Sequence, residues 1–143
     1  LTVGFLGGLL IIALVPGYRS LWLGFKEEPP EQQLLGEWIH NHFEKPQALF
    51  GSDCRACFYA GPSCERFVSM SRIHDSMPDE RFLEDFLLRE GVGLVAADER
   101  YVPKFYPRFK FLLEPSGPTW LKRLAVLGEE GEIIIVYQFE RKE

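Results

Sequence analysis

The stretch from Asp79 to Pro103 constrains the fold more than any other part of the chain. Apolar residues repeat at the spacing of one helix face from Phe82 to Leu87, and Gly91 is the residue type that ends helices. The run Val92–Ala97 then contains no polar side chain, which is typical of a strand buried on both faces. A helix followed by such a strand predicts a right-handed crossover into an interior parallel strand.

The remaining patterns predict further elements of the same domain. An amphipathic helix, two short strands, a helical segment interrupted at Pro107 and the two strands of a hairpin are expected. Their ranges are Glu31–Phe43, Gln47–Phe50, Phe67–Met70, Lys104–Leu113, Trp120–Leu127 and Glu132–Phe139. The order predicts an α/β fold: a small three-layer, Rossmann-like sheet with mostly parallel strands and a C-terminal antiparallel hairpin, preceded by an N-terminal hydrophobic helix.

The first fifteen residues carry no charge, and Pro16 and Gly17 follow them. Because about 20 apolar residues are needed to cross a bilayer, this run fits the end of a transmembrane helix. A signal peptide and a buried helix are the alternatives, but glycines destabilise a water-soluble helix and no cleavage pattern follows. We therefore expect residues 1–24 to be the helix end and interface segment, residues 25–30 a linker, and residues 31–143 a soluble domain.

Charge separates the classes of partner. The net charge is −5, and acidic and basic residues are interspersed without a basic face or a long block of like charge. Nucleic-acid binding depends on such a basic face, so we expect no nucleic-acid partner. His40 and His42 diverge on the predicted helix, which favours solvent exposure over a shared metal or proton.

Three cysteines form the sharpest local motif: Cys54 and Cys57 in a Cys-x-x-Cys spacing, and Cys64. A disulfide or plain buried thiols are favoured, with thiol-disulfide exchange and metal binding as alternatives. Arg55 would stabilise a thiolate, whereas Asp53 would oppose it. Metal binding would need a fourth ligand such as the distant His74, which does not give a zinc spacing, so we predict no metal site and no cofactor.

A charged cluster, Asp98, Glu99, Arg100 and Tyr101, follows the buried strand. It lies at the carboxyl end of that strand, the edge at which open α/β sheets commonly bind ligands. The favoured interpretation is a loop in which the arginine pairs with its neighbours and Asp98 caps the next helix. The alternative is an edge that binds a ligand or partner, and no second convergent group supports it from the sequence.

The order of these segments resembles a known family. The resemblance is carried by Glu37-Trp38-Ile39, by Phe58 to Gly61 and, most specifically, by Gly91 to Tyr101, with the interrupted helix and terminal hairpin after them. It is to the C-terminal end of bacterial integral-membrane glycosyltransferases similar to dolichyl-phosphate-mannose protein mannosyltransferases and to the lipid A aminoarabinose transferase. Ala96-Ala97 and the cysteine cluster depart from that pattern.

The resemblance implies an enzyme that uses a polyprenyl-phosphate sugar donor and whose catalytic carboxylates precede this segment. It therefore implies no catalytic residue here. The chain would be a soluble periplasmic appendage at the inner membrane that covers the active site or helps select the acceptor. Its partners would be the bilayer, the membrane portion of its own chain and a lipid-linked sugar or acceptor. A membrane-tethered binding or thiol-redox module is the alternative.

Overall fold

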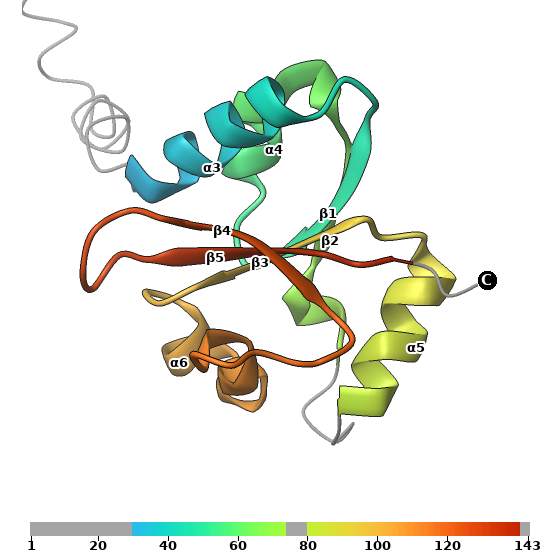
Figure 1. The fold of residues 1–143 in the computed structure, drawn as a ribbon, viewed down its shortest axis with the longest axis vertical. Helices are drawn as coiled ribbons and strands as arrows, with labels where there is room; N and C mark the ends of the chain where they lie inside the picture. Colours follow the sequence, from blue (N-terminus) through green and yellow to red (C-terminus); the bar gives the residue numbers. More distant parts are fainter. Residues whose placement is uncertain (1–29, 74–79, 141–143) are drawn as a thin grey trace, which may run out of the picture.

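The computed structural model describes residues 30–73 and 80–140. Five strands form one sheet in the order β2-β1-β3-β5-β4 (Figure 1). The strands are β1 Gln47–Gly51, β2 Cys64–Ser69, β3 Leu94–Asp98, β4 Lys122–Leu127 and β5 Ile134–Gln138. The α-helices are α3 Pro30–His42, α4 Arg55–Ala60, α5 Glu80–Glu90 and α6 Val102–Phe105. Three 3₁₀ helices complete the elements: η1 Gly61–Ser63, η2 Met70–Arg72 and η3 Pro107–Leu113.

The sheet is mixed, which corrects the prediction of mostly parallel strands. β1 pairs in parallel with β2 and β3, whereas β3 with β5 and β5 with β4 are antiparallel. The predicted hairpin is confirmed, and its turn uses Gly128 and Gly131 at φ values of 89° and 86°. Because this hairpin adds two strands at once and docks through β5 onto β3, half of the pairings in the sheet are antiparallel.

Helices cover both faces of the sheet, above and below it in Figure 1. Alternate residues of β3 serve the two faces: Leu94 and Ala96 pack with α3 and α4, while Val95 and Ala97 pack toward α5 and η3. All five residues of β3 are buried, and β3 lies inside the sheet and parallel to β1. The prediction of an interior parallel strand buried on both faces is therefore confirmed.

The α3–α4 contact is close because both helices present small residues to each other. A Cβ added to Gly36 would lie 2.3 Å from the Cβ of Tyr59 and 2.6 Å from the carbonyl oxygen of Ala56. Ala56 and Ala60 are fully buried beneath this contact. Sequence periodicity did not indicate α4, since its six residues are too few to show a helical repeat.

Several predicted boundaries move by a few residues. α3 begins at Pro30, which we had placed in the linker, and β2 begins three residues before the predicted Phe67. The interrupted helix is confirmed as α6 and η3, separated at Tyr106 before Pro107. The expected N-terminal hydrophobic helix lies outside the described residues. Among the helices that are described, none has both the length and the apolar character needed to span a bilayer.

Candidate functional site

The carboxyl ends of β1 and β3 lie side by side because the two strands are parallel neighbours. After β1 the chain passes to α4 on one face of the sheet, and after β3 it passes to α6 and η3 on the other. Neighbouring strands whose connections leave on opposite faces form the crevice in which open α/β sheets commonly bind ligands. We call the charged and polar residues at this place the strand-edge cluster; they are Glu31, Ser52, Asp53, Arg55, Asp98, Glu99, Arg100, Tyr101 and Glu132.

Asp98 is the buried centre of the strand-edge cluster, with 2% of its surface exposed. Its carboxylate accepts hydrogen bonds from the Ser52 hydroxyl and, at 2.5 Å, from the backbone N–H of Tyr101. Burial raises the pKa of Asp98, and these two hydrogen bonds offset part of that effect. The carboxylate thus joins the loop after β1 to the turn that leads into α6.

Asp53 and Arg55 form a forked ion pair beside Asp98. The Nε and Nη2 atoms of Arg55 lie 3.0 Å and 2.5 Å from the Asp53 carboxylate, which also accepts the Arg55 backbone N–H at 2.9 Å. Burial works to raise the pKa of Asp53, but the bonds from Arg55 outweigh it and lower that pKa. The same bond with Asp53, with a smaller contribution from Tyr101, raises the pKa of Arg55.

Arg100 connects two further segments to the end of β3. Its Nε atom lies 3.0 Å from Oε1 of Glu31, and its Nη2 atom donates to Glu132 just before β5. Glu31 is only 1% exposed, and neither of its carboxylate oxygens has a hydrogen bond of good geometry among the described residues. The contact with Arg100 is therefore an ion pair that compensates a buried charge at the start of α3.

Glu99 points away from these groups, toward the hairpin. Its Oε2 atom accepts the backbone N–H of Gly131 at 3.0 Å and that of Ile133 at 3.4 Å. The four predicted residues are thus all engaged within the domain: Asp98 with Ser52 and the Tyr101 backbone, Glu99 with the hairpin, and Arg100 with Glu31 and Glu132. The space enclosed among Gln32, Ser52, Asp53 and Asp98 leaves no room for a water molecule.

The cysteines give a fixed link and one free thiol. Cys57 and Cys64 form a disulfide with their Cα atoms 5.2 Å apart, which ties α4 to the start of β2. Cys54 is an exposed free thiol, so the Cys-x-x-Cys spacing does not form a pair with itself. Within residues 30–73 and 80–140, no three His, Cys, Asp or Glu residues come together as a metal site, and His74 lies outside these ranges.

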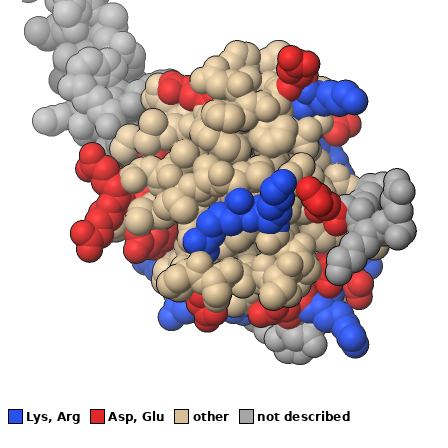
Figure 2. All heavy atoms as spheres, in the orientation of Figure 1, with Lys and Arg blue, Asp and Glu red and all other residues tan. Residues whose placement is uncertain are grey.

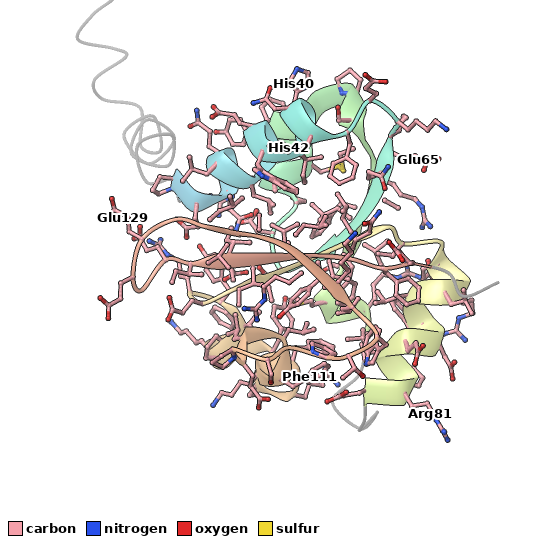
Figure 3. All side chains as sticks on the ribbon, viewed as in Figure 1. His40, His42, Glu65, Arg81, Phe111 and Glu129 are labelled. Atoms are coloured by element: carbon pink, nitrogen blue, oxygen red, sulfur yellow. A yellow bond between two sulfur atoms is a disulfide. The ribbon has the colours of Figure 1, made fainter. Side chains whose placement is uncertain are left out.

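The two histidines of α3 lie at the surface (Figure 3). The ring of His42 stacks on Trp38 with centroids 4.4 Å apart, and its Nδ1 atom lies 2.7 Å from the Trp38 carbonyl oxygen. His40 and His42 are both exposed, as their divergent spacing predicts.

A second hollow lies between the β4–β5 hairpin and η3, and we call it the hairpin groove. It has a volume of about 530 Å³. It is lined by Glu99, Pro103, Lys110, Leu113, Glu114, Pro115, Arg123, Val126, Ile133 and Ile135. In Figure 2 a few basic side chains cross the middle of the visible face, where Figure 1 draws the hairpin, with acidic side chains at the right end of this band and uncharged surface above and below it. This is the open hollow of the described domain, in contrast to the filled strand edge.

The sequence predicted the β3 side of the strand-edge cluster, but not the residues from other segments that complete it. Ser52, Glu31 and Glu132 complete the bonds of the predicted residues, but they come from separate segments. A carboxyl-edge residue after β1 could have been sought once the strand before Gly51 was recognised. The hairpin groove combines three segments without a local motif, so no sequence pattern signals it.

Comparison with known proteins assigns no family. No family model matches the sequence, and neither the curated proteins nor the solved structures provide a match.

Proposed function

We propose that this chain is the C-terminal periplasmic domain of a polytopic inner-membrane glycosyltransferase that uses a polyprenyl-phosphate sugar donor. In this proposal the domain carries no catalytic residue, and it covers the active site or helps select the acceptor. The membrane portion of the same chain, the bilayer and a lipid-linked sugar or acceptor are its partners. The resemblance in segment order, strongest from Gly91 to Tyr101, supports the family assignment.

The observation that carries the non-catalytic role is the state of the strand-edge cluster. Asp98, the only buried carboxylate at the end of a described strand, is saturated by Ser52 and Tyr101. Asp53 is paired with its neighbour Arg55, and Glu99 and Arg100 are bonded to the hairpin and to Glu31. Acid–base or nucleophilic catalysis needs groups that can reach a reacting atom, whereas these groups are bonded within the domain around a space with no room for a water molecule. They support a structural role for the edge and leave the hairpin groove as the surface for recognition.

Removing the domain from the full enzyme tests the role. Deletion of residues 32–143 is expected to lower the rate of sugar transfer or to change the range of acceptors. Transfer should be normalised to the amount of enzyme in the membrane, because deletion can also reduce folding. An unchanged rate together with an unchanged acceptor range would contradict the proposal.

The free thiol offers a direct test of location. Because Cys54 is exposed, a maleimide that does not cross membranes should label it in intact spheroplasts of cells that produce the full protein. A Cys54→Ser variant gives the background. Labelling only after the inner membrane is lysed would place the domain in the cytoplasm and overturn the periplasmic assignment.

A thiol-redox module is the second candidate, and one observation favours it. Exposed Cys54 precedes α4, and disulfide-bonded Cys57 lies one helical turn further along the chain. Against it, Arg55 is paired with Asp53 and is not free to stabilise a thiolate. Faster reduction of a test disulfide by dithiothreitol in the presence of the purified chain, lost in Cys54→Ser, would favour this candidate over the glycosyltransferase domain.

A further inference from the structure

The floor of the hairpin groove is aliphatic and draws on three segments that are distant in the sequence. Leu113 comes from η3, Val126 from β4 and Ile135 from β5, and Val126 pairs in register with Ile135. Val126 is 54% exposed, although it points to the same face of the sheet as Ile135, which is buried. Solvent therefore reaches an aliphatic surface that η3 only partly covers.

The rim of the groove is charged, and its acidic and basic groups differ in how many of their hydrogen-bonding atoms are already bound within the domain. Glu99 is occupied by two backbone N–H groups of the hairpin. Arg123 donates hydrogen bonds only from its Nη2 atom, to the Glu114 carbonyl oxygen at 2.8 Å and to the Tyr137 hydroxyl at 3.3 Å. Its Nε and Nη1 atoms have no hydrogen-bond partner among the described residues. The rim therefore keeps unused donors on a fixed cation.

Lys110 and Glu114 are the other two charged residues of the rim. Neither side chain has an ion-pair or hydrogen-bond partner within the described ranges, and both are exposed. The groove is thus lined by two cations, Lys110 and Arg123, and two carboxylates, Glu99 and Glu114. Because Glu99 is already bound by two backbone N–H groups, the side chains left to bind a ligand are two hydrogen-bond donors and one acceptor. An anionic group with several acceptor oxygens complements this rim better than a neutral or cationic one.

We propose that the hairpin groove binds a single anionic amphiphile, with its aliphatic chain on the floor and its oxyanion at Lys110 and Arg123. A hollow of about 530 Å³ falls within the range of small-molecule sites, which are mostly apolar with a few polar groups that fix orientation. The aliphatic floor supplies affinity by burial, and the two cations select the charged end.

An added peptide strand fits this surface less well. β4 is an edge strand, but Lys122 and Arg123 occupy its first half, and its pairing with β5 is irregular between Arg123 and Ala125. Charges and irregular pairing are devices that protect edge strands from further pairing. Only the short half around Val126 remains regular, which leaves little backbone for a peptide.

This inference deepens the proposed function by naming the chemistry that the domain would recognise, but it rests on the groove and not on the family assignment. Binding is measured on the chain without its parent enzyme. Failure of binding would leave the deletion experiment unaffected, and failure of the deletion experiment would leave a binding result intact. The two proposals can therefore be rejected separately.

Photo-crosslinking of the full 143-residue chain in phosphatidylcholine nanodiscs tests the site. Three probes with the same diazirine-bearing dodecyl chain are compared: a phosphate, a carboxylate and an uncharged alcohol. We expect the two anions to label the peptides that contain Leu113, Val126 and Ile133, and the alcohol to label them less. Lys110→Gln should reduce labelling by the anions about fivefold, as expected for loss of a partly exposed ion pair.

Matched variants keep the result interpretable. Lys45→Gln removes an exposed lysine outside the groove and is the control for Lys110→Gln. Leu88→Asp places a carboxylate at an exposed apolar position on α5 and is the control for Val126→Asp. Both controls should label as the unchanged chain does. If Val126→Asp does not fold by circular dichroism, the Lys110→Gln comparison remains.

Three outcomes would overturn the proposal. These are equal labelling by the anions and the alcohol, labelling by the anions outside the groove, and labelling that is unchanged in Lys110→Gln. Displacement of the anionic probes by an extended apolar peptide more effectively than by unlabelled dodecyl phosphate would also overturn it, in favour of a peptide site.

Discussion

The strand-edge cluster and the hairpin groove both gather charged side chains around one sheet, but they use them in opposite ways. At the strand edge, Asp98 is bonded to Ser52, Asp53 to Arg55 and Arg100 to Glu31, and the enclosed space is filled. In the groove, Lys110 and Glu114 have no partner within the described residues, above an open aliphatic floor. The difference teaches that residue type and position at a strand end indicate a site only where the groups remain unsatisfied.

If the closed region is structural, changes there should lower stability and changes in the groove should not. The largest effect is expected at Gly36, which sets how closely α3, the helix that carries Glu31, lies on α4. In Gly36→Ala, the new Cβ would overlap the Tyr59 Cβ and the Ala56 carbonyl oxygen. We expect the free energy of unfolding to fall by about 3 kcal/mol, despite a helix-propensity gain of about 1 kcal/mol.

Urea unfolding followed by circular dichroism measures this, and Gly93→Ala is the matched control. There the added Cβ would meet only the side-chain oxygen of Gln47 at 2.6 Å, and a flexible amide can move away. Its loss should stay below about 1 kcal/mol. Equal losses in the two variants would contradict the close α3–α4 contact.

The disulfide should give the next largest effect. Replacing Cys57 and Cys64 together by Ala opens a short loop between α4 and β2, and the chain-entropy relation gives about 2.5 kcal/mol for its closure. Cys54→Ser, which alters only an exposed thiol, should change stability by less than about 0.5 kcal/mol. Titration of the native, unreduced chain should find one reactive thiol, and three would rule out the bond.

Asp98 should show an intermediate effect that depends on its chemistry. Asp98→Ala leaves the Tyr101 N–H and the Ser52 hydroxyl without their acceptor in a buried place, and we expect a loss of about 2 kcal/mol. Asp98→Asn keeps an acceptor for Tyr101 and removes the buried charge, so it should be as stable as the unchanged chain at pH 7, or more stable. A loss in Asn as large as in Ala would show that the charge itself is required.

The pKa of Asp98 also predicts a sign for the pH dependence. Because its folded pKa is raised, the folded state binds the proton more tightly, and this contribution to stability falls as pH rises from the unfolded pKa through the folded pKa. Asp53 has a lowered pKa and acts in the opposite direction at lower pH, where stability is lost as pH falls through its folded pKa. Urea unfolding from pH 3 to 8 should therefore show a decline above the ordinary Asp range that disappears in Asp98→Asn.

The elements that the sequence predicted well are those whose signal is local. The uninterrupted apolar run before Asp98 identified an interior strand, and Gly128 and Gly131 marked the hairpin turn. α4 was not predicted, because its buried face consists of Ala56 and Ala60 alone and shows no periodic apolar pattern. The strand order was not predicted, because nothing local decides that the hairpin docks beside β3 through β5.

The same holds for the candidate site: residues with a local signal were predicted, and their distant partners were not. Asp98 to Tyr101 were selected because they follow a buried strand, but their partners Ser52, Glu31 and Glu132 lie between 32 and 69 residues away. The pairing of Cys57 with Cys64 rather than with Cys54 depends on where β2 begins beside α4. Whether a charged residue has hydrogen-bond or ion-pair partners depends on tertiary contacts, so it could not be predicted from the sequence alone.

The smallest effect on stability is expected in the hairpin groove. Measuring it tests directly whether the groove and the strand-edge cluster differ in their role. Lys110→Gln removes a charge that has no partner within residues 30–73 and 80–140, so the free energy of unfolding should change by less than about 0.5 kcal/mol. Arg100→Gln, the matched change at the strand edge, leaves the buried Glu31 carboxylate without its cation and should lower stability by about 1.5 kcal/mol. Urea unfolding of both variants at pH 7 gives the two values side by side. Equal losses would mean that the groove charges support the fold as the edge charges do. The proposal that the groove charges bind a ligand would then be contradicted.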